Sequence, residues 1–391
     1  MAPVAIRSPL PLQLDLKKGH TMAKTRLAVL YGGITVEHEV SVITAVQLMK
    51  RADASKYDIT PVYVDKSGKW WTGSQLFDIA YYGPQDLFAP KGLSSWQLRL
   101  EPGSNDIDVA ILCFHGAYGE AGNVQGALEL AGIPYQGPGV VGAAAAFDKI
   151  ITRQVLQAEG VNQAKFTWCT ATEWQKDPAA VQQRVDALTY PIFVKPANGG
   201  STIGIEKVKS ATELPAAVTR VLAFDERLVF EAEIKDCLEI NVSVLGLEGD
   251  AHASVPEQPI KADEFLSYAD KYERGGGKKG GMASASRRIP APISQSLTSK
   301  VQAAALRAFH IFDCHGVIRI DFFVNPSTEE IFLVELNTIP GSMSYYLWEA
   351  TKLPYAQMID LLVEIAQTKH ARRQKITTSF ASNILKDKKE I

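Results

Sequence analysis

Three absences narrow the class of protein that this sequence can encode. The 391 residues include four cysteines that lie far apart and form no CxxC pair, which argues against a disulfide framework and a thiolate zinc site. No apolar run approaches the roughly 18 to 20 residues of a membrane span. The formal net charge of -2 provides no general attraction to nucleic acid or membranes. We therefore expect a globular cytoplasmic enzyme that acts on small molecules, with neither nucleic acid nor a membrane as partner.

The two ends of the chain are expected to lie outside the folded core. Residues 1–24 lack the continuous apolar segment of a secretory signal, so we predict a flexible leader, with Met22 as an alternative translation start. Residues 371–391 are polar and basic, which predicts a frayed tail. Between them the length suits about two or three domains of roughly 150 residues each.

Strands alternate with helices in the first part of the chain. "RLAVLYGG" predicts a strand and tight turn, "EHEVSVITAVQLMKRA" has helical apolar spacing, and further apolar runs at 57–65, 108–116 and 132–137 predict more strands. This alternation predicts a parallel α/β sheet covered by helices on both faces, over residues 25–138. Ligands bind at the carboxyl ends of such strands, where Glu37 and His115 lie.

Two smaller units are expected to follow. Residues 139–235 contain a helical connector and the stretch "TYPIFVKPANGGSTIGIEKV", which predicts strand, glycine-rich loop, strand. Residues 236–370 contain a long loop at 266–294, a helix at 295–312, a hairpin and a closing helix at 354–370. The loop segment "GGGKKGGMASASRR" suits either a linker or a lid that closes over substrates.

The glycine-rich loop is the strongest local signal for an anion site. Lys195 ends a strand, and the small residues at 199–204 would let backbone N–H groups approach phosphate oxygens. The loop is not a P-loop, because GxxxxGK[ST] is absent. A glycine-rich hairpin with a surface lysine would have the same pattern.

The stretch "RIDFFVNPSTEEIFLVELNT" places polar groups inside two apolar strands. Because side chains alternate along a strand, Arg319 and Asp321 share one face of a hairpin, and Glu335 and Asn337 share the same face of its partner strand. Phe332 and Val334 are then expected to face the core. The oxygen-bearing side chains would suit Mg²⁺ beside nucleotide phosphates. A salt-bridge network on a solvated face is the alternative.

Two other motifs suggest different chemistry. "GPGVVG" at 137–142 matches the dinucleotide pattern GxGxxG, with Glu159 near the acidic position, but it does not follow the first strand. "HIFDCH" at 310–315 gathers possible metal ligands, yet no second pair has zinc spacing, which favours an ordinary helix end.

Taken together and in order, seven motifs resemble the D-alanine–D-alanine ligases of the ATP-grasp superfamily. They are "YGGITVEHEVS", "FHGAYGEAGNVQGALELAGIPYQGPGV", "FDK", "VKPANGGSTIGI", "YADKY", "RIDFF" and "ELNTIPG". The resemblance covers about residues 25–370. It implies an ATP-grasp fold of three domains, an α/β N-terminal domain followed by two domains, the last of α+β type, that sandwich ATP. It also implies a homodimer that uses ATP and two Mg²⁺ ions, or Mn²⁺, to make D-alanyl-D-alanine for peptidoglycan precursors.

The resemblance assigns roles residue by residue. It places the ATP phosphates beside Lys149 and Lys195, the adenine beside Glu231 and Ile234, and the ribose beside Glu239. The implied metal ligands are Asp321, Glu335 and Asn337. The implied catalytic groups are Glu37, Ser201, Tyr272, Arg319 and Gly341. The implied substrate-binding residues are His115, Lys271, Ser342 and Ser344.

The chain departs from the family where the second substrate binds. After "NTIPG" it carries only "SMSYY" before "LWEA", which is shorter than usual, so either Ser342 or Ser344 is expected to seat the second substrate's carboxylate. Tyr272 beside Lys271 favours an amine as second nucleophile. A related ligase that uses D-lactate, D-serine or another acceptor remains the alternative. Outside this class, a nucleotide-binding regulator without catalysis and an oxidoreductase using "GPGVVG" are the other hypotheses.

Overall fold

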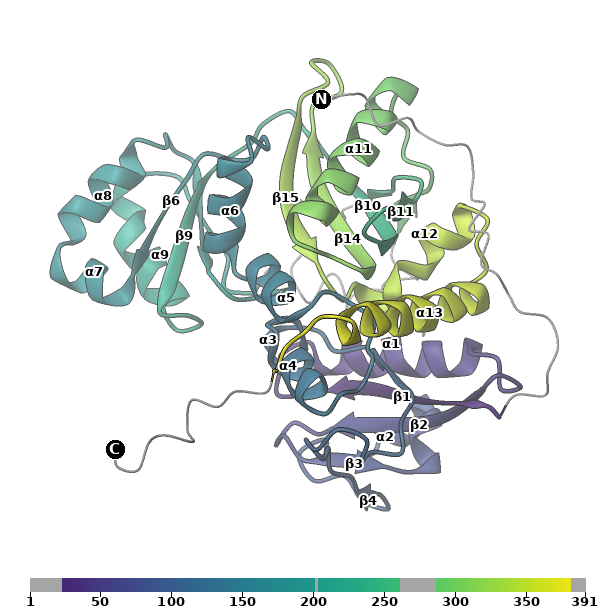
Figure 1. Cartoon of the computed structure of the whole chain (residues 1–391). Helices are drawn as coiled ribbons and strands as arrows, with labels where there is room; N and C mark the ends of the chain where they lie inside the picture. The colour runs from purple at the N-terminus through teal and green to yellow at the C-terminus, as the bar shows by residue number, and fades with distance from the viewer. Residues whose placement is uncertain (1–22, 201–202, 261–285, 381–391) are drawn as a thin grey trace.

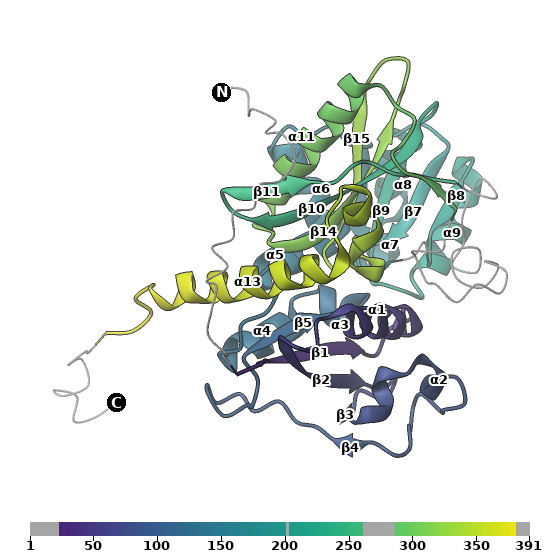
Figure 2. The same ribbon diagram turned by 90° about the vertical axis from the view of Figure 1, so that its right-hand side faces the viewer.

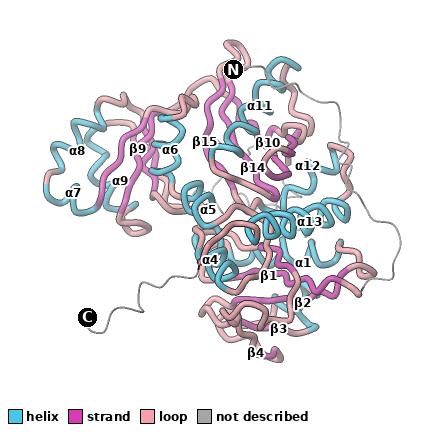
Figure 3. The backbone as a smooth tube through the Cα atoms, in the orientation of Figure 1, coloured by secondary structure: helices cyan, strands magenta, loops and turns pink. Residues whose placement is uncertain are grey.

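The computed structural model describes residues 23–200, 203–260 and 286–380 (Figure 1). The expected leader and the end of the expected tail lie almost wholly outside these residues, as does most of the expected lid. Figure 3 shows that the described strands gather into separate sheets with helices around them. The three larger sheets fall within 25–138, 139–235 and 236–370, although the domain boundaries themselves stay predictions.

The N-terminal sheet is parallel only at its centre. Its strand order is β4-β3-β2-β1-β5, and β1 pairs in parallel with β2 and with β5. Strand β3 pairs antiparallel with β2 and with β4, which the helix–strand alternation did not predict. The expected strand at 132–137 forms only a bridge between Ala110 and Tyr135. The strands are β1 Thr25–Gly32, β2 Tyr57–Val64, β3 Trp70–Thr72, β4 Ser94–Ser95 and β5 Val109–Leu112.

Helices pack on this sheet because their apolar side chains form one stripe. The elements of the N-terminal unit are α1 His38–Arg51, η1 Ser74–Phe77, α2 Ile79–Tyr82, α3 Ala117–Glu120 and α4 Asn123–Leu130. The closing helix α13, Tyr355–Gln374, shares a single buried core with β1, β2 and β5. Figure 2 shows α13 lying between the N-terminal sheet and the C-terminal sheet. The helix ends at Gln374, beyond the predicted end at His370.

The middle sheet is antiparallel, with strand order β6-β9-β7-β8. Helices α7, α8 and α9 cover one face and α6 lies on the other (Figure 1). The strands are β6 Phe166–Thr170, β7 Ile192–Pro196, β8 Glu206–Val208 and β9 Arg227–Ala232. The helices are α5 Val140–Phe147, α6 Lys149–Ala158, α7 Ala171–Lys176, α8 Pro178–Asp186, η2 Ala211–Glu213 and α9 Leu214–Val221.

The C-terminal sheet is also antiparallel, in the order β11-β10-β14-β15. Helix α11 packs its apolar face on this sheet and begins at a side-chain cap, since Ser294 Oγ accepts from Leu297 N at 3.1 Å. The strands are β10 Leu238–Leu247, β11 Asp250–Ala253, β14 Gly316–Val324 and β15 Ile331–Asn337, with the small pair β12 Gln258–Pro259 and β13 Arg287–Arg288 beside them. The helices are α11 Gln295–Ile311, η4 Gly341–Ser344 and α12 Tyr345–Ala350.

The β14–β15 hairpin confirms one part of the predicted alternation and corrects another. Asp321 lies directly opposite Glu335, as expected, but the register then shifts so that Phe322 faces Leu333. Val334 is the extra residue of this β-bulge. Strict alternation predicted that Phe332 and Val334 face the core, but both are only half-buried. Leu333, whose exposure is 1%, faces the core instead.

Among the residues that the structure describes, no helix combines the length and apolar character needed to cross a membrane.

Candidate active site

A cavity lies where the three units meet. It holds about 810 Å³ of space that protein atoms do not fill, including space open to solvent. Seven of the residues predicted for the site line it, and they are Glu37, His115, Lys149, Arg319, Glu335, Asn337 and Gly341. Three further predicted residues are not part of the lining: Glu231 pairs with the lining residue Arg153, Asp321 pairs with the lining residue Arg319, and Lys195 pairs with Glu231.

The polar face of the hairpin forms one wall. Arg319 donates from Nε and Nη2 to the two carboxylate oxygens of Asp321, both at 2.7 Å, and Asn337 Nδ2 donates to Asp321 Oδ2 at 3.1 Å. Burial raises the pKa of Asp321 to about 6 against the opposing effect of Arg319, and the negative charges of Glu335 and Glu239 raise it further. Arg319 and Asp321 are thus buried while Glu335 and Asn337 are half-buried, and the face carries more negative charge than its guanidinium offsets.

These side chains suit a hard divalent cation. Asp321 and Glu335 supply carboxylate oxygens, and Asn337 keeps its amide oxygen available, since its amide nitrogen is the atom that bonds Asp321. A cation here would also relieve the repulsion that raises the pKa of Asp321. Within the described ranges no group of three or more His, Cys, Asp or Glu side chains is arranged to hold a metal ion by itself, and this includes "HIFDCH".

Cationic side chains form the opposite wall. Lys149 Nζ donates to the backbone oxygen of Gly199 at 2.5 Å, at the start of the glycine-rich loop. Burial lowers the pKa of Lys149, and the nearby Lys195 lowers it as well, while Glu335 opposes both. Lys195 Nζ lies 2.6 Å from Glu231 Oε2. Lys149 of α6 therefore lines the cavity, and Lys195 of β7 lies close to it, paired with Glu231.

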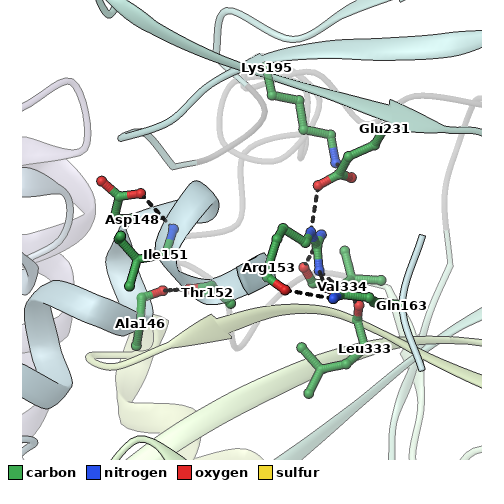
Figure 4. Close-up of polar contacts among 10 residues, drawn as sticks. All are labelled: Ala146, Asp148, Ile151, Thr152, Arg153, Gln163, Lys195, Glu231, Leu333 and Val334. Atoms are coloured by element: carbon green, nitrogen blue, oxygen red, sulfur yellow. Dashed lines mark hydrogen bonds and ion pairs between the residues drawn. The ribbon is translucent and has the colours of Figure 1, made fainter. Parts of the chain in front are cut away.

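Arg153, which sequence reasoning missed, connects these walls (Figure 4). Its side chain is buried on α6, and Nε donates to Glu231 Oε1 at 2.7 Å. Its other nitrogens donate to the backbone oxygens of Leu333 at 3.1 Å and Val334 at 2.6 Å, at the β15 bulge. Burial by itself would raise the pKa of Glu231, but Arg153 and Lys195 outweigh it and hold the pKa at about 2.

Glu120 is a second buried ionisable group that sequence reasoning missed. It accepts from Gly116 N at 2.8 Å, Ile339 N at 3.1 Å and Thr338 Oγ1 at 3.2 Å. Burial raises its pKa to about 8, and the neighbouring carboxylate of Glu37 adds to this shift. Glu120 thereby ties the loop after β5 to the end of β15.

His115 and the turn after β15 meet at Thr44. Burial lowers the pKa of His115 to about 4, and its Nε2 lies 2.9 Å from Thr44 Oγ1. Thr44 Oγ1 also accepts from Ser342 N at 3.0 Å. The two serines that were candidates for the second substrate's carboxylate, Ser342 and Ser344, are buried and do not line the cavity.

Of the remaining predicted residues, Glu239 and Ile234 are described by the structure and three others are not. Glu239 lies on β10, on the same sheet face as Asp321, because Asn241 pairs with Asp321 and alternate residues share a face. Ile234 follows β9, is half-buried and does not line the cavity. The predicted site residues Ser201, Lys271 and Tyr272 lie outside the described residues.

"GPGVVG" has a packing role. Its last glycine, Gly142, lies on α5, and an added Cβ there would collide with the backbone oxygen of Phe312. The acidic candidate Glu159 is exposed at the end of α6 and does not follow a strand. Neither feature supports a dinucleotide site.

Two antiparallel sheets flank the site, one with Lys195 on β7 and the other with Asp321 on β14 and Glu335 on β15, and this arrangement defines an ATP-grasp enzyme. The sequence matches two family descriptions, "D-ala D-ala ligase N-terminus" at residues 26–138 and "D-ala D-ala ligase C-terminus" at residues 155–364. The chain belongs to the D-alanine–D-alanine ligase family, and membership implies the use of ATP and a divalent metal ion.

Individual relatives cover nearly the whole chain. A D-alanine–D-alanine ligase of Bacillus cytotoxicus is 36% identical over 91% of this chain and 99% of its own length. One from Deinococcus radiodurans is 37% identical over 88% of this chain and 98% of its own. Among solved structures, the D-alanine-D-alanine ligase from Coxiella burnetii has 29% identity and a TM-score of 0.76, covering 90% of this chain and 96% of that one. The VanG D-Ala:D-Ser ligase from Enterococcus faecalis has 26% identity and a TM-score of 0.75, covering 88% and 100%.

Proposed function

We propose that this enzyme joins two D-alanine molecules, with ATP converted to ADP and phosphate, to supply D-alanyl-D-alanine for peptidoglycan precursors. The observation that carries the proposal is the cavity itself, where the carboxylate face of the hairpin opposes Lys149 and where Glu37, His115 and Gly341 complete the lining. Such a site has one wall for a metal ion and one for phosphates, with room beside them for amino acids.

The first step activates a carboxylate. The carboxylate of the first D-alanine attacks the γ-phosphorus of ATP and gives D-alanyl phosphate and ADP. Lys149 and Lys195 are proposed to bind the phosphates, with Glu231 and Ile234 at adenine and Glu239 at ribose. Lys195 can turn toward phosphate because Arg153 remains beside Glu231 and keeps that buried carboxylate paired. Glu37 is proposed to receive the substrate ammonium.

Two Mg²⁺ ions, or Mn²⁺ in their place, would be held by Asp321, Glu335 and Asn337. When bound, the metal offsets the negative charge of the transferred phosphoryl group. Ser201 and Tyr272 are proposed to close over Glu37.

The second step forms the peptide bond. The amine of the second D-alanine attacks the acyl carbon, the carbon–oxygen bond to phosphate breaks, and phosphate leaves. Negative charge gathers on the carbonyl oxygen, where Arg319 and the backbone N–H of Gly341 are proposed to stabilise it. His115 and Lys271, together with one of Ser342 and Ser344, are proposed to seat this second substrate. Because both serines lie behind the lining, a small movement of the turn must accompany that role.

The test measures product and phosphate together. Purified protein with ATP, Mg²⁺ and D-alanine should release one phosphate for each dipeptide detected by mass spectrometry. An acceptor screen with D-serine, D-lactate and other amino acids separates the related ligases, and turnover only with another acceptor would overturn the D-alanine assignment. Nicotinamide cofactor binding that survives Glu335→Ala would instead support an oxidoreductase.

We also propose that the enzyme works in the cytoplasm as a homodimer. The four cysteines are unpaired, which suits a reducing compartment, and the resemblance to dimeric ligases supports the second copy. Light scattering in solution should give twice the chain mass of 42.7 kDa.

A further inference from the structure

Thr44 connects two parts of the cavity without lining it. It lies on α1, about two turns after Glu37, and its side chain is buried at 1% exposure. Its hydroxyl lies 2.9 Å from His115 Nε2 and accepts from Ser342 N at 3.0 Å. One hydroxyl therefore contacts both the histidine of the N-terminal unit and the turn that follows β15.

The Thr44 hydroxyl can pair with both neighbours at once. Buried His115 has a pKa lowered to about 4, so its ring is neutral at pH 7 and carries one N–H. With that N–H on Nδ1, Nε2 accepts the Thr44 hydroxyl proton; with it on Nε2, the ring donates to the hydroxyl oxygen. In both tautomers the hydroxyl oxygen accepts from Ser342 N.

The turn that Thr44 contacts has an unfavourable backbone. Ser342, Met343 and Ser344 have φ values of 53°, 53° and 50°, a left-handed conformation that residues with a Cβ rarely adopt in succession. Such a conformation persists only where the surroundings enforce it. Met343 N donates to Pro340 O at 2.8 Å, the Met343 side chain is fully buried, and Ser342 N is held by Thr44.

We propose that Thr44 is a positioning residue for the second substrate, because its hydroxyl fixes the His115 ring and the Gly341–Ser344 turn at the same time. His115 and Gly341 line the cavity and Thr44 does not, so Thr44 acts through them. The proposal rests on the proposed function, in which both groups serve the second D-alanine. It also explains how this shortened turn is held beside the reacting carbonyl.

The kinetic test compares two threonine-to-valine variants. Thr44→Val keeps the side-chain shape and removes the hydroxyl. We expect the KM for the second D-alanine to rise about tenfold, since an unpaired buried donor costs about that factor, with the KM for ATP unchanged. Thr44→Ser keeps a hydroxyl that can pair with Ser342 N–H, so its KM for the second D-alanine should lie within about twofold of wild type.

Thr351→Val is the matched control. The Thr351 hydroxyl also makes two hydrogen bonds, outside the cavity and without a histidine, donating to Leu347 O at 2.7 Å and accepting from Val255 N at 3.1 Å. All kinetic constants of this variant should equal wild type. A wild-type KM in Thr44→Val, or equal changes in the two valine variants, would overturn the proposal.

A spectroscopic measurement tests the contact independently of turnover. In ¹⁵N spectra of histidine-labelled protein, with His115 assigned by His115→Gln, Thr44→Val should shift the Nε2 resonance toward that of an imidazole nitrogen without a hydrogen bond. An unchanged resonance contradicts the proposal. If the wild-type protein makes no dipeptide, the proposed function fails, whereas the His115 resonance still decides whether Thr44 orients the ring.

Discussion

Replacing Arg153 should weaken the fold and the metal wall together. Arg153 is 2% exposed and serves three acceptors on two other elements, which are Glu231 on β9 and the backbone oxygens of Leu333 and Val334 on β15. The β-bulge at Val334, whose backbone oxygen is one of these acceptors, immediately precedes Glu335. The contacts of Arg153 should therefore determine where the Glu335 carboxylate lies.

The structure distinguishes two substitutions at this position. In Arg153→Met, Lys195 is the remaining cation beside Glu231, and the backbone oxygens of Leu333 and Val334 lose the Arg153 donors. We expect the free energy of unfolding to fall by about 3 kcal/mol, at the low end for breaking a buried ion pair. Arg153→Lys keeps the charge but cannot reproduce the guanidinium fork. Losing one or two hydrogen bonds at about 1 kcal/mol each predicts a smaller loss of about 1–2 kcal/mol.

Urea unfolding followed by tryptophan fluorescence measures these losses, and phosphate release measures function. We expect both variants to lower D-alanine-dependent turnover at least about tenfold, an outcome equal to about 1.4 kcal/mol of transition-state stabilisation. If Arg153→Met unfolds within about 1 kcal/mol of wild type, well below the cost of a broken buried pair, the bridge does not stabilise the fold. If its turnover is normal, Arg153 does not position Glu335.

Three further substitutions test separate parts of the site. Glu335→Ala should abolish Mg·ATP turnover, seen as loss of phosphate release with an unchanged circular dichroism spectrum. Gly200→Ala places a methyl against the Glu37 carboxylate and should raise the KM for the first D-alanine about tenfold, as expected for one displaced charged contact. Glu120, with a native pKa of about 8, holds a proton that the unfolded carboxyl loses near 4.5, so its contribution to stability falls as pH rises between these values. The lowered pKa of His115 has the opposite effect on stability, but only below pH 6.5, the pKa of the unfolded imidazole. Between pH 6.5 and 8, Glu120→Gln should therefore reduce the decline of the unfolding free energy, by at most about 1.4 kcal/mol per pH unit.

Alternation along strands predicted the functional face of the hairpin because the side-chain period is fixed at two residues. It placed Arg319, Asp321, Glu335 and Asn337 together correctly. The bulge at Val334 could not be predicted in this way, since an inserted residue changes the register without interrupting the apolar run. The partner of the bulge lies elsewhere in the sequence, because Arg153 of α6 donates to the backbone oxygens of Leu333 and Val334.

A sequence signal for Arg153 did exist. Ile150, Arg153 and Leu156 are spaced three residues apart and all are buried on one side of α6, so a charge on the apolar stripe indicated a buried partner. What the sequence could not supply was the partner, because Glu231 lies 78 positions away and pairing depends on how α6 packs against β9. Glu120 was hidden for the same reason, since its donors at Thr338 and Ile339 come from another unit.

Burial is the largest cause of the pKa shift on each wall, but the neighbouring charges that add to it have opposite signs on the two walls, and together the shifts favour one kind of ligand. Lys149 is buried near Lys195, so its pKa is lowered and its positive charge is incompletely offset. Asp321 is buried near Glu335 and Glu239, so its pKa is raised and negative charge is in excess on its side. A lone anion would satisfy the lysine wall and worsen the carboxylate wall, and a lone cation would do the reverse. A metal ion bound together with phosphates offsets both, because each charge lies against the wall of opposite sign. ATP and its metal should therefore bind cooperatively, and each alone should bind more weakly than the pair.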